Sequence, residues 1–293
     1  MPSRTIHALL QIAMLLGLPA CAGMVNPSFP VSMEDARADL QRMRERPHAL
    51  ERPVVVLAGY LDPGLGSAWL AWKIRNLTGD PRVIGVDFFT CSTFDDCRAR
   101  VIEEVSRAFP SANPDETAEV DVIGMSMGGL VARHAAMPQR DGTSSKRLKL
   151  ARLFTIGSPH RGARMAAIPS FHTLHLSMRV DSPFLSQLNA AYPDADYKVY
   201  SYVRLGDSIV GVENSAPPGE SPWWVSGGLC PSAHIGAVMD PRIHSYIARR
   251  LRSERPFSIV PPFDPPDGQV DRPVPLLDSS LYYVGTDVGQ TAG

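Results

Sequence analysis

Short apolar runs along the chain are separated by stretches with the period of an amphipathic helix. The runs are continuous rather than alternating, which is typical of strands covered on both faces, as in a parallel sheet. They occupy residues 53–58, 83–86, 120–124, 153–156 and 198–203. Helical patterns occupy residues 33–46, 68–77, 95–109, 127–136 and 241–251. Because strand and helix alternate, the sequence predicts a doubly wound, mostly parallel α/β sheet.

Two segments fall outside this alternation. Residues 163–195 carry many apolar side chains, with a short helix predicted from Ser182-Pro183 to Tyr192. This segment is either a small cap over an active site or one more helix packed on the sheet. The tail from residue 256 is rich in proline and predicts an extended C-terminal arm. The α/β domain is thus expected over residues 53–255, after an N-terminal linker and helix at 21–52, with the C-terminal extension at 256–293.

The N-terminus predicts export. Arg4 precedes an apolar run over residues 8–18, which is too short to span a bilayer and typical of a signal-peptide core at residues 1–20. The run ends in Leu18-Pro19-Ala20-Cys21, which resembles the bacterial lipobox, in which the cysteine is lipidated. The resemblance implies a membrane-anchored lipoprotein on the periplasmic side or in the outer membrane. The alternative is an ordinary secretory signal with Cys21 incidental.

Composition limits the partners and the cross-links. The 293-residue chain is 44% hydrophobic with a formal net charge of -1, so it lacks the basic footprint of a nucleic-acid-binding protein. Besides Cys21 it has Cys91, Cys97 and Cys230. An exported chain permits disulfides, and each pairing among these three is open, with the third thiol left free. No His/Cys spacing indicates a zinc site, and neither a metal nor a cofactor is predicted.

A candidate nucleophile lies between the third strand and its helix. Gly124-Met125-Ser126-Met127-Gly128-Gly129 fits the pattern G-x-S-x-G, with an apolar strand before it and a good helix after it. That strand–turn–helix context is the nucleophile elbow of α/β-hydrolases. The sharp turn presents the serine hydroxyl beside a helix N-terminus, whose free N–H groups favour an oxyanion. We therefore predict Ser126 as a catalytic nucleophile.

A serine needs a base and an acid, which this fold supplies in the order Ser, Asp or Glu, His. Among the eight histidines, His234 lies in a predicted loop just before the last helix, where it can reach the serine. His244 lies on that helix and is expected at the surface. Asp207 directly follows the strand at 198–203 and is the preferred acid. The alternative acids are Asp181, Asp194, Asp196 and Glu213.

An acyl-transfer site also needs hydrogen-bond donors for the tetrahedral oxyanion. Met127 follows the nucleophile and supplies one backbone N–H. The loop after the first strand, Gly59-Tyr60-Leu61, is expected to supply the second, from the N–H of Tyr60.

Four blocks in this order resemble bacterial triacylglycerol lipases and related esterases. They are residues 54–60, 124–133, Phe154-Thr155-Ile156-Gly157-Ser158-Pro159-His160-Arg161-Gly162, and Gly206-Asp207-Ser208-Ile209-Val210. The resemblance covers roughly residues 53–252 and implies the α/β-hydrolase fold. It also implies a Ser126–Asp207–His234 triad, an oxyanion hole at Tyr60 and Met127, and a structural role for His160. The chain departs from many lipases in having Ala58-Gly59 where they have His-Gly.

The sequence thus predicts a serine hydrolase that cleaves a carboxylic ester or lipid through an acyl-enzyme. A phospholipase, thioesterase or acyltransferase with the same triad is the alternative within enzymes, because specificity depends on the pocket. A lipoprotein that binds lipid or a partner without turnover is the alternative outside enzymes. The oligomeric state is not predicted.

Overall fold

The computed structural model describes residues 26–138, 146–227 and 232–266. Within them lies one six-stranded sheet in the order β2-β1-β3-β4-β5-β6, and every neighbouring pair is parallel. The predicted signal peptide, Cys21, Cys230 and residues 267–293 of the extension lie outside the described residues. The strands are β1 (Val54–Leu57), β2 (Val83–Val86), β3 (Val120–Met125), β4 (Leu150–Ile156), β5 (Lys198–Arg204) and β6 (Trp223–Val225).

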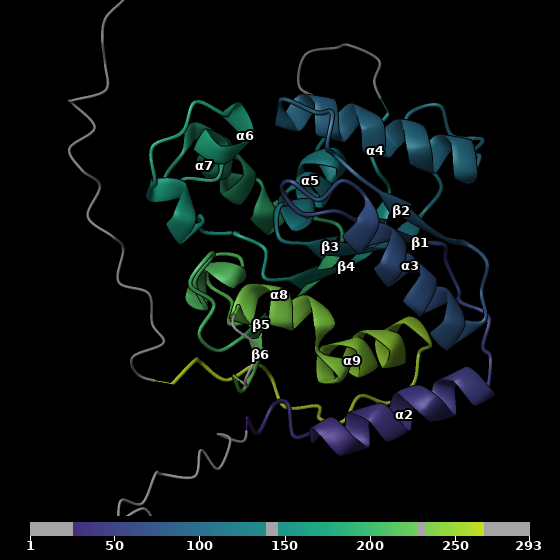
Figure 1. The fold of residues 1–293 in the computed structure, drawn as a ribbon. Coiled ribbons are helices and arrows are strands. Elements are labelled where there is room, and N and C mark those ends of the chain that lie inside the picture. The colour runs from purple at the N-terminus through teal and green to yellow at the C-terminus, as the bar shows by residue number, and fades with distance from the viewer. Residues whose placement is uncertain (1–25, 139–145, 228–231, 267–293) are drawn as a thin grey trace, which may run out of the picture.

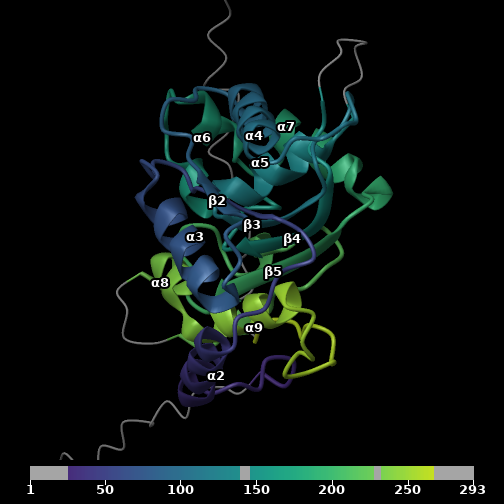
Figure 2. The same ribbon diagram turned by 90° about the vertical axis from the view of Figure 1, so that its right-hand side faces the viewer.

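Helices cover both faces of the sheet (Figure 1). One face carries α4 (Phe94–Ala108) and α5 (Met127–Ala136), with α6 (Thr173–Ser177) and α7 (Pro183–Ala190) beside them. The other carries α3 (Leu65–Thr78), α8 (Ala233–Met239) and α9 (Pro241–Leu251). Figure 2 shows α2 (Met33–Glu45) as an outermost layer on α9. This arrangement confirms the predicted doubly wound sheet.

Apart from short 3₁₀ turns, the sequence pattern located most elements to within a few residues; it did not predict α6, within residues 163–195, or two elements outside that segment. The predicted helices at 127–136 and 241–251 are α5 and α9, and Ser32 caps α2 by accepting from Asp35 N. The edge strand β6 and the short helix α8 were not predicted. Three and seven residues are too few to establish a hydrophobic period, so their conformation is decided by packing on β5 and α9.

Two apolar cores hold the layers together. The core on the α4–α5 face joins β1 and β3 to residues such as Val101, Leu130 and Leu188. The core on the opposite face joins Ile123 and Phe154 to α2, α3 and α9. Because both faces of the sheet are buried, its central strands tolerate no regular polar alternation, which accounts for their continuous apolar runs.

The segment between β4 and β5 has two parts. The later part, α7, packs on the helical layer, where Phe184 stacks on Phe94 with ring centroids 4.0 Å apart. The earlier part contains a 3₁₀ turn at Arg164–Ala167 and the five-residue α6. It lies beside the loop after β1, because His172 and His175 face the ring of Tyr60 at 5.4 and 6.3 Å.

The two ends of the described chain meet on the edge of the sheet formed by β6. Phe29 stacks on Tyr246 of α9 with ring centroids 3.9 Å apart. Phe263 N donates to Ser28 Oγ (3.3 Å), and the indole of Trp224 donates to Phe263 O (3.0 Å). None of the helices in the described ranges is long and apolar enough to cross a membrane.

Candidate active site

Ser126 lies in the turn between β3 and α5. Its backbone has φ 49° and ψ -121°, a strained conformation for a residue with a side chain. Ser126 N donates to Ile156 O of β4 (2.9 Å), which holds the turn against the carboxyl end of the sheet. The predicted elbow is therefore the conformation that the chain adopts at Ser126.

The glycines around Ser126 permit this turn by close backbone approach. A Cβ at Gly124 would lie 2.5 Å from Gly129 N, and a Cβ at Gly128 would lie 2.6 Å from Leu57 O. These separations are shorter than any normal contact, so the first turn of α5 can pack against the end of β1 only without side chains there. Glycine at these positions thus seats Ser126 between β1 and β4.

Asp207 and His234 are in direct contact. His234 Nδ1 lies 2.7 Å from Asp207 Oδ2, and both side chains are largely withdrawn from solvent, with 12% and 0% exposure. The other carboxylate oxygen, Oδ1, accepts from Ile209 N and Val210 N at 3.0 Å each. The carboxylate is thereby fixed in orientation. Because a carboxylate oxygen only accepts, Nδ1 is the donor in this contact, and in the neutral tautomer of imidazole Nε2 is then the acceptor nitrogen.

Gly157 connects this pair to the elbow. It follows Ile156, the residue that accepts from Ser126 N, and its own N–H donates to Tyr202 O (2.9 Å). A Cβ at Gly157, which has φ 59°, would lie 3.0 Å from His234 Nδ1 and 3.3 Å from Asp207 Oδ2. The structure therefore brings Ser126, Asp207 and His234 to the same end of the sheet, with Gly157 between the serine turn and the pair. No separate role for Gly157 was predicted from the sequence.

His234 lies on a helix and not in the predicted loop. It is the second residue of α8, whose N-cap Ser232 accepts from Ile235 N. Gly236 of the same helix packs directly on the guanidinium of Arg204, at the end of β5. In the sequence, the preceding Pro and Ser residues indicate a loop. In the structure, contact with β5 stabilises the segment as two helical turns, which position the imidazole.

One predicted oxyanion donor, Met127, directly follows Ser126, and the residue before the other, Tyr60, lies close to Ser126. Met127 is the first residue of α5, so its N–H has no partner within the helix. A Cβ on Gly59, the residue before Tyr60, would lie 3.3 Å from Ser126 Cβ. Asp62 braces this loop, because its carboxylate accepts from Gly64 N and Gly66 N (3.0 Å each) and from Ser67 N (3.1 Å).

The other histidines examined are engaged elsewhere. His160 is buried between Arg133 Nη1 (3.1 Å) and Thr155 Oγ1 (3.2 Å), and burial holds its pKa well below the ordinary value. His244 is fully buried rather than at the surface as predicted, because α9 is covered by α2 and α3. Its ring donates to Val238 O (2.7 Å), and burial lowers its pKa to about 3. His134 pairs with Asp95 (2.8 Å).

Two of the alternative acids have other settings. Asp196 pairs with Arg147 (2.8 Å) and Lys149 (3.2 Å), and Asp194 lies in a 3₁₀ turn after α7. Asp207 is the acid that contacts the histidine. No cluster of three or more His, Cys, Asp or Glu side chains among the described residues is placed to hold a metal ion.

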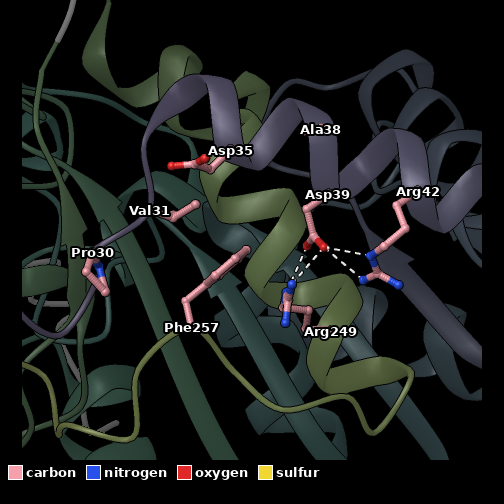
Figure 3. A pocket seen from close by; sticks show the side chains of 8 residues that line it. All are labelled: Pro30, Val31, Asp35, Ala38, Asp39, Arg42, Arg249 and Phe257. Atoms are coloured by element: carbon pink, nitrogen blue, oxygen red, sulfur yellow. Dashed lines mark hydrogen bonds and ion pairs between the residues drawn. The ribbon is translucent and has the colours of Figure 1, made fainter.

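A separate cavity of about 390 Å³ lies between α2, α9 and Phe257 (Figure 3). Three of its charged groups form one hydrogen-bonded cluster, because the Asp39 carboxylate accepts from Arg249 (2.7 and 2.8 Å) and Arg42 (2.8 Å). The guanidinium of Arg249 also stacks on the ring of Phe257 (3.9 Å). Paired charges of this kind hold the α2–α9 layer together and leave no group poised for chemistry.

The six-stranded parallel sheet, its two helical layers and the elbow together form an α/β-hydrolase-like fold. Residues 96–191 match the family model described as a PGAP1-like alpha/beta domain, which spans less than half of the chain. The match supports the predicted fold class and leaves the lipase-like branch as a prediction. No curated protein sequence matches the chain.

Several solved structures resemble the model at low identity. Phospholipase PlaB from Legionella pneumophila, in complex with thio-NAD, is 13% identical with a TM-score of 0.49, over 67% of this chain and 57% of that one. Lipase BlEst2 from Bacillus licheniformis, in its propeptide form, is 14% identical with a TM-score of 0.48, over 74% and 53%. The metagenomic carboxyl esterase MGS0156 is 13% identical with a TM-score of 0.48, over 71% and 77%. This chain thus spans little more than half the length of the first two, and identities this low extend no activity to it.

Proposed function

We propose that the protein is a serine hydrolase that cleaves carboxylic esters, with Ser126 as nucleophile, His234 as general base and Asp207 as the orienting acid. The observation that carries the proposal is the 2.7 Å contact between His234 Nδ1 and Asp207 Oδ2 beside the strained turn of Ser126. A fixed carboxylate, an imidazole with Nε2 left to accept, and a serine at a helix N-terminus are the parts that acyl transfer requires.

The reaction then has two steps. His234 Nε2 takes the proton of Ser126 Oγ as the oxygen attacks the ester carbonyl, and the oxyanion accepts hydrogen bonds from the N–H groups of Met127 and Tyr60. His234 returns the proton to the leaving alcohol, which produces an acyl-enzyme. Water, deprotonated by the same imidazole, then releases the carboxylic acid.

The surroundings of the site favour an apolar ester. Large apolar side chains stand exposed on the loops and short helices that follow the carboxyl ends of the strands, and we call this set the apolar rim. Leu65 is 77% exposed and Phe171 is fully exposed. Exposed apolar groups gathered around a site commonly mark the surface that meets an apolar ligand. The apolar rim consists of Leu61, Leu65, Phe89, Met165, Ile168, Phe171 and Ile235.

Hydrolysis of p-nitrophenyl esters from C2 to C16, together with labelling by a fluorophosphonate, tests the proposal. We expect turnover of these esters and phosphonylation at Ser126, and a loss of activity of at least about 10⁴-fold in Ser126→Ala. Ser92→Ala, at an exposed serine, is the matched control and should retain full activity. Esterase activity that survives Ser126→Ala would exclude the proposed nucleophile. Labelling without ester turnover would favour a thioesterase or acyltransferase.

We infer the cellular location of the enzyme from its N-terminal sequence. The signal-peptide pattern and the resemblance of Leu18-Pro19-Ala20-Cys21 to a lipobox support an exported enzyme with a lipid on Cys21. Metabolic labelling with a fatty acid, followed by fractionation, tests this anchor. We expect the label and the membrane association to disappear in Cys21→Ser. Retention of the variant in membranes would refute a lipid anchor at Cys21.

A further inference from the structure

Two cysteines lie close together in the β2–α4 loop and at the start of α4. Cys91 lies half-buried in the loop between β2 and α4, and Cys97 is buried in the first turns of α4. Their thiols are free, and they are hydrogen-bonded to each other. The two thiols are therefore within hydrogen-bonding reach of each other without a covalent bond.

The backbone around the pair is already arranged to keep the thiols together. Cys91 N donates to Phe88 O (3.0 Å), which turns the loop back after β2. Thr93 and Asp96 then form a capping box: Thr93 Oγ1 accepts from Asp96 N (3.1 Å), and Asp96 Oδ2 accepts from Thr93 N (2.9 Å). Two thiols within hydrogen-bonding reach must approach each other further to reach the S–S bond length of about 2.05 Å.

The loop that carries Cys91 supports the predicted oxyanion loop. A Cβ on Gly64 would lie 3.4 Å from Asp87 Cβ, so the loop after β1 rests on the start of the loop after β2. Arg100 of α4 reaches Thr90 Oγ1 (3.0 Å) and Asp87 Oδ2 (3.4 Å). A covalent tie between Cys91 and Cys97 would therefore fasten this supporting loop to α4.

We propose that Cys91 and Cys97 form a reversible disulfide that braces the β2–α4 loop, with a small-molecule or protein disulfide as the oxidant. The thiolate of Cys91, the more accessible of the two, attacks one sulfur of the oxidant and displaces the other as a thiolate. The thiolate of Cys97 then attacks the Cys91 sulfur of the mixed disulfide and releases the second half of the oxidant. Two protein thiols lose two electrons and two protons, and the oxidant is reduced to two thiols.

Burial raises the pKa of both thiols. Thiol–disulfide exchange needs the thiolate, so the folded pair should oxidise slowly at neutral pH and faster as the pH rises. The disulfide would therefore form most readily before the loop packs, or with the help of an oxidoreductase.

The spacing of basic residues gives a direct test by peptide mapping. Trypsin cleaves after Arg82 and Arg98, so one peptide, residues 83–98, contains both cysteines. The full chain is unfolded and refolded in the presence of oxidised glutathione or of dithiothreitol, and is then denatured, alkylated with iodoacetamide and digested. We expect this peptide to lack two hydrogens and carry no alkyl group after oxidation, and to carry two alkyl groups after reduction. Two alkyl groups after both treatments, or a cross-link to the peptide that contains Cys230, residues 205–242, would overturn the proposal.

Thermal unfolding tests the brace. The oxidised wild type should unfold at a temperature higher by about 5 °C than the reduced protein, as a disulfide closing a short loop predicts. Cys91→Ser and Cys97→Ala should each abolish this dependence on redox state, and the half-buried position of Cys91 makes the first variant the gentler change. An oxidised wild type that unfolds at the same temperature as the reduced one would refute the brace. A change in ester turnover would rest on the proposed function, whereas the mapping and the unfolding data would not.

Discussion

At the carboxyl end of the sheet and in the α2–α9 layer, a buried carboxylate meets a basic side chain, with different results. One carboxylate oxygen of Asp207 accepts from two backbone N–H groups, and the other contacts a single imidazole. An imidazole is a group that can gain or lose a charge. Asp39 accepts from two guanidinium groups and from Ser245, and guanidinium keeps its charge at any working pH. The first arrangement can pass a proton, whereas the second can only hold helices together.

The two regions also differ in backbone and surface. Around Ser126 the chain has positive φ angles at Ser126 and Gly157, glycines in close contact, and the exposed apolar rim. The α2–α9 layer consists of regular helices capped by Ser32 and Asp240. Strain and exposed apolar surface lie where chemistry is proposed, and well-paired polar groups lie where stability is needed.

The largest expected difference between the two regions comes from substitution of Asp207, which should affect activity, and of Asp39, which should affect stability. Asp207→Asn should lower kcat for a p-nitrophenyl ester by about 10⁴-fold, because an amide no longer holds the Nδ1 proton of His234 in place. The melting temperature should change little. Asp240→Asn, at the cap of α9, is the matched control and should leave kcat unchanged. Equal loss of kcat in both variants would contradict a special role for Asp207.

Asp39→Ala should lower stability and leave activity unchanged. Removal of this carboxylate leaves Arg249 without its buried partner, and the free energy of unfolding should fall by about 3 kcal/mol. The specific activity of the folded fraction should stay at the wild-type level. Denaturant titration measures the first effect, and Glu103→Ala, which breaks an exposed pair with Arg107, should cost less than about 0.5 kcal/mol. A loss from Asp39→Ala as small as that control would contradict the role assigned to the α2–α9 layer.

Gly157→Ala tests the contact between the serine turn and the Asp207–His234 pair. The new Cβ would press on His234 Nδ1, and displacement of the ring should lower kcat/KM by about 10- to 100-fold. Gly219→Ala is the matched control: its φ is also positive, at 82°, but a Cβ there has no atom within 4 Å. It should cost about 1 kcal/mol of stability from backbone strain and leave kcat/KM unchanged. Equal effects on kcat/KM would assign the loss to strain rather than to contact.

The smallest expected effect is a dependence of stability on pH. Burial lowers the pKa of His244 from 6.5 to about 3, so between these values the unfolded chain binds a proton that the folded chain does not. The stability from this group is complete above pH 6.5 and declines toward pH 3, by at most about 1.4 kcal/mol per pH unit. The decline between pH 6.5 and 4.5 should be shallower in His244→Gln, and an unchanged slope would contradict it.

Asp39 should contribute only in stronger acid. Burial raises its pKa, but the hydrogen bonds from Arg249, Ser245 and Arg42 outweigh that effect and hold the pKa below 3.8. A depressed carboxyl pKa stabilises the fold above the unfolded value, and the contribution is lost as the pH falls below it. Its loss therefore begins below the range used for His244, which keeps the two effects separate.

The sequence located the candidate nucleophile well and the histidine less well. The pattern around Ser126 is local, because a strand, a glycine-rich turn and a helix follow one another within about fifteen residues. The strand and the helix each have a recognisable hydrophobic pattern. His234 lies in a segment that lacks such a period, so its helix was not predicted. His244 was predicted at the surface although it is buried. Its helix is strongly periodic, but helical periodicity does not reveal that α2 and α3 also pack on α9.

By itself, the sequence determined the alternation of the main strands and helices and the parallel α/β class, and it predicted Ser126 as the candidate nucleophile, because these depend on residues close together in the chain. Only the tertiary structure decided that Asp207, rather than Asp194 or Asp196, contacts His234, and that Gly157 separates this pair from the serine turn. It also decided which charges are neutralised, as at Asp39. Such choices depend on contacts between distant segments, and the free energy of burying a polar group is set by the partners that folding brings to it.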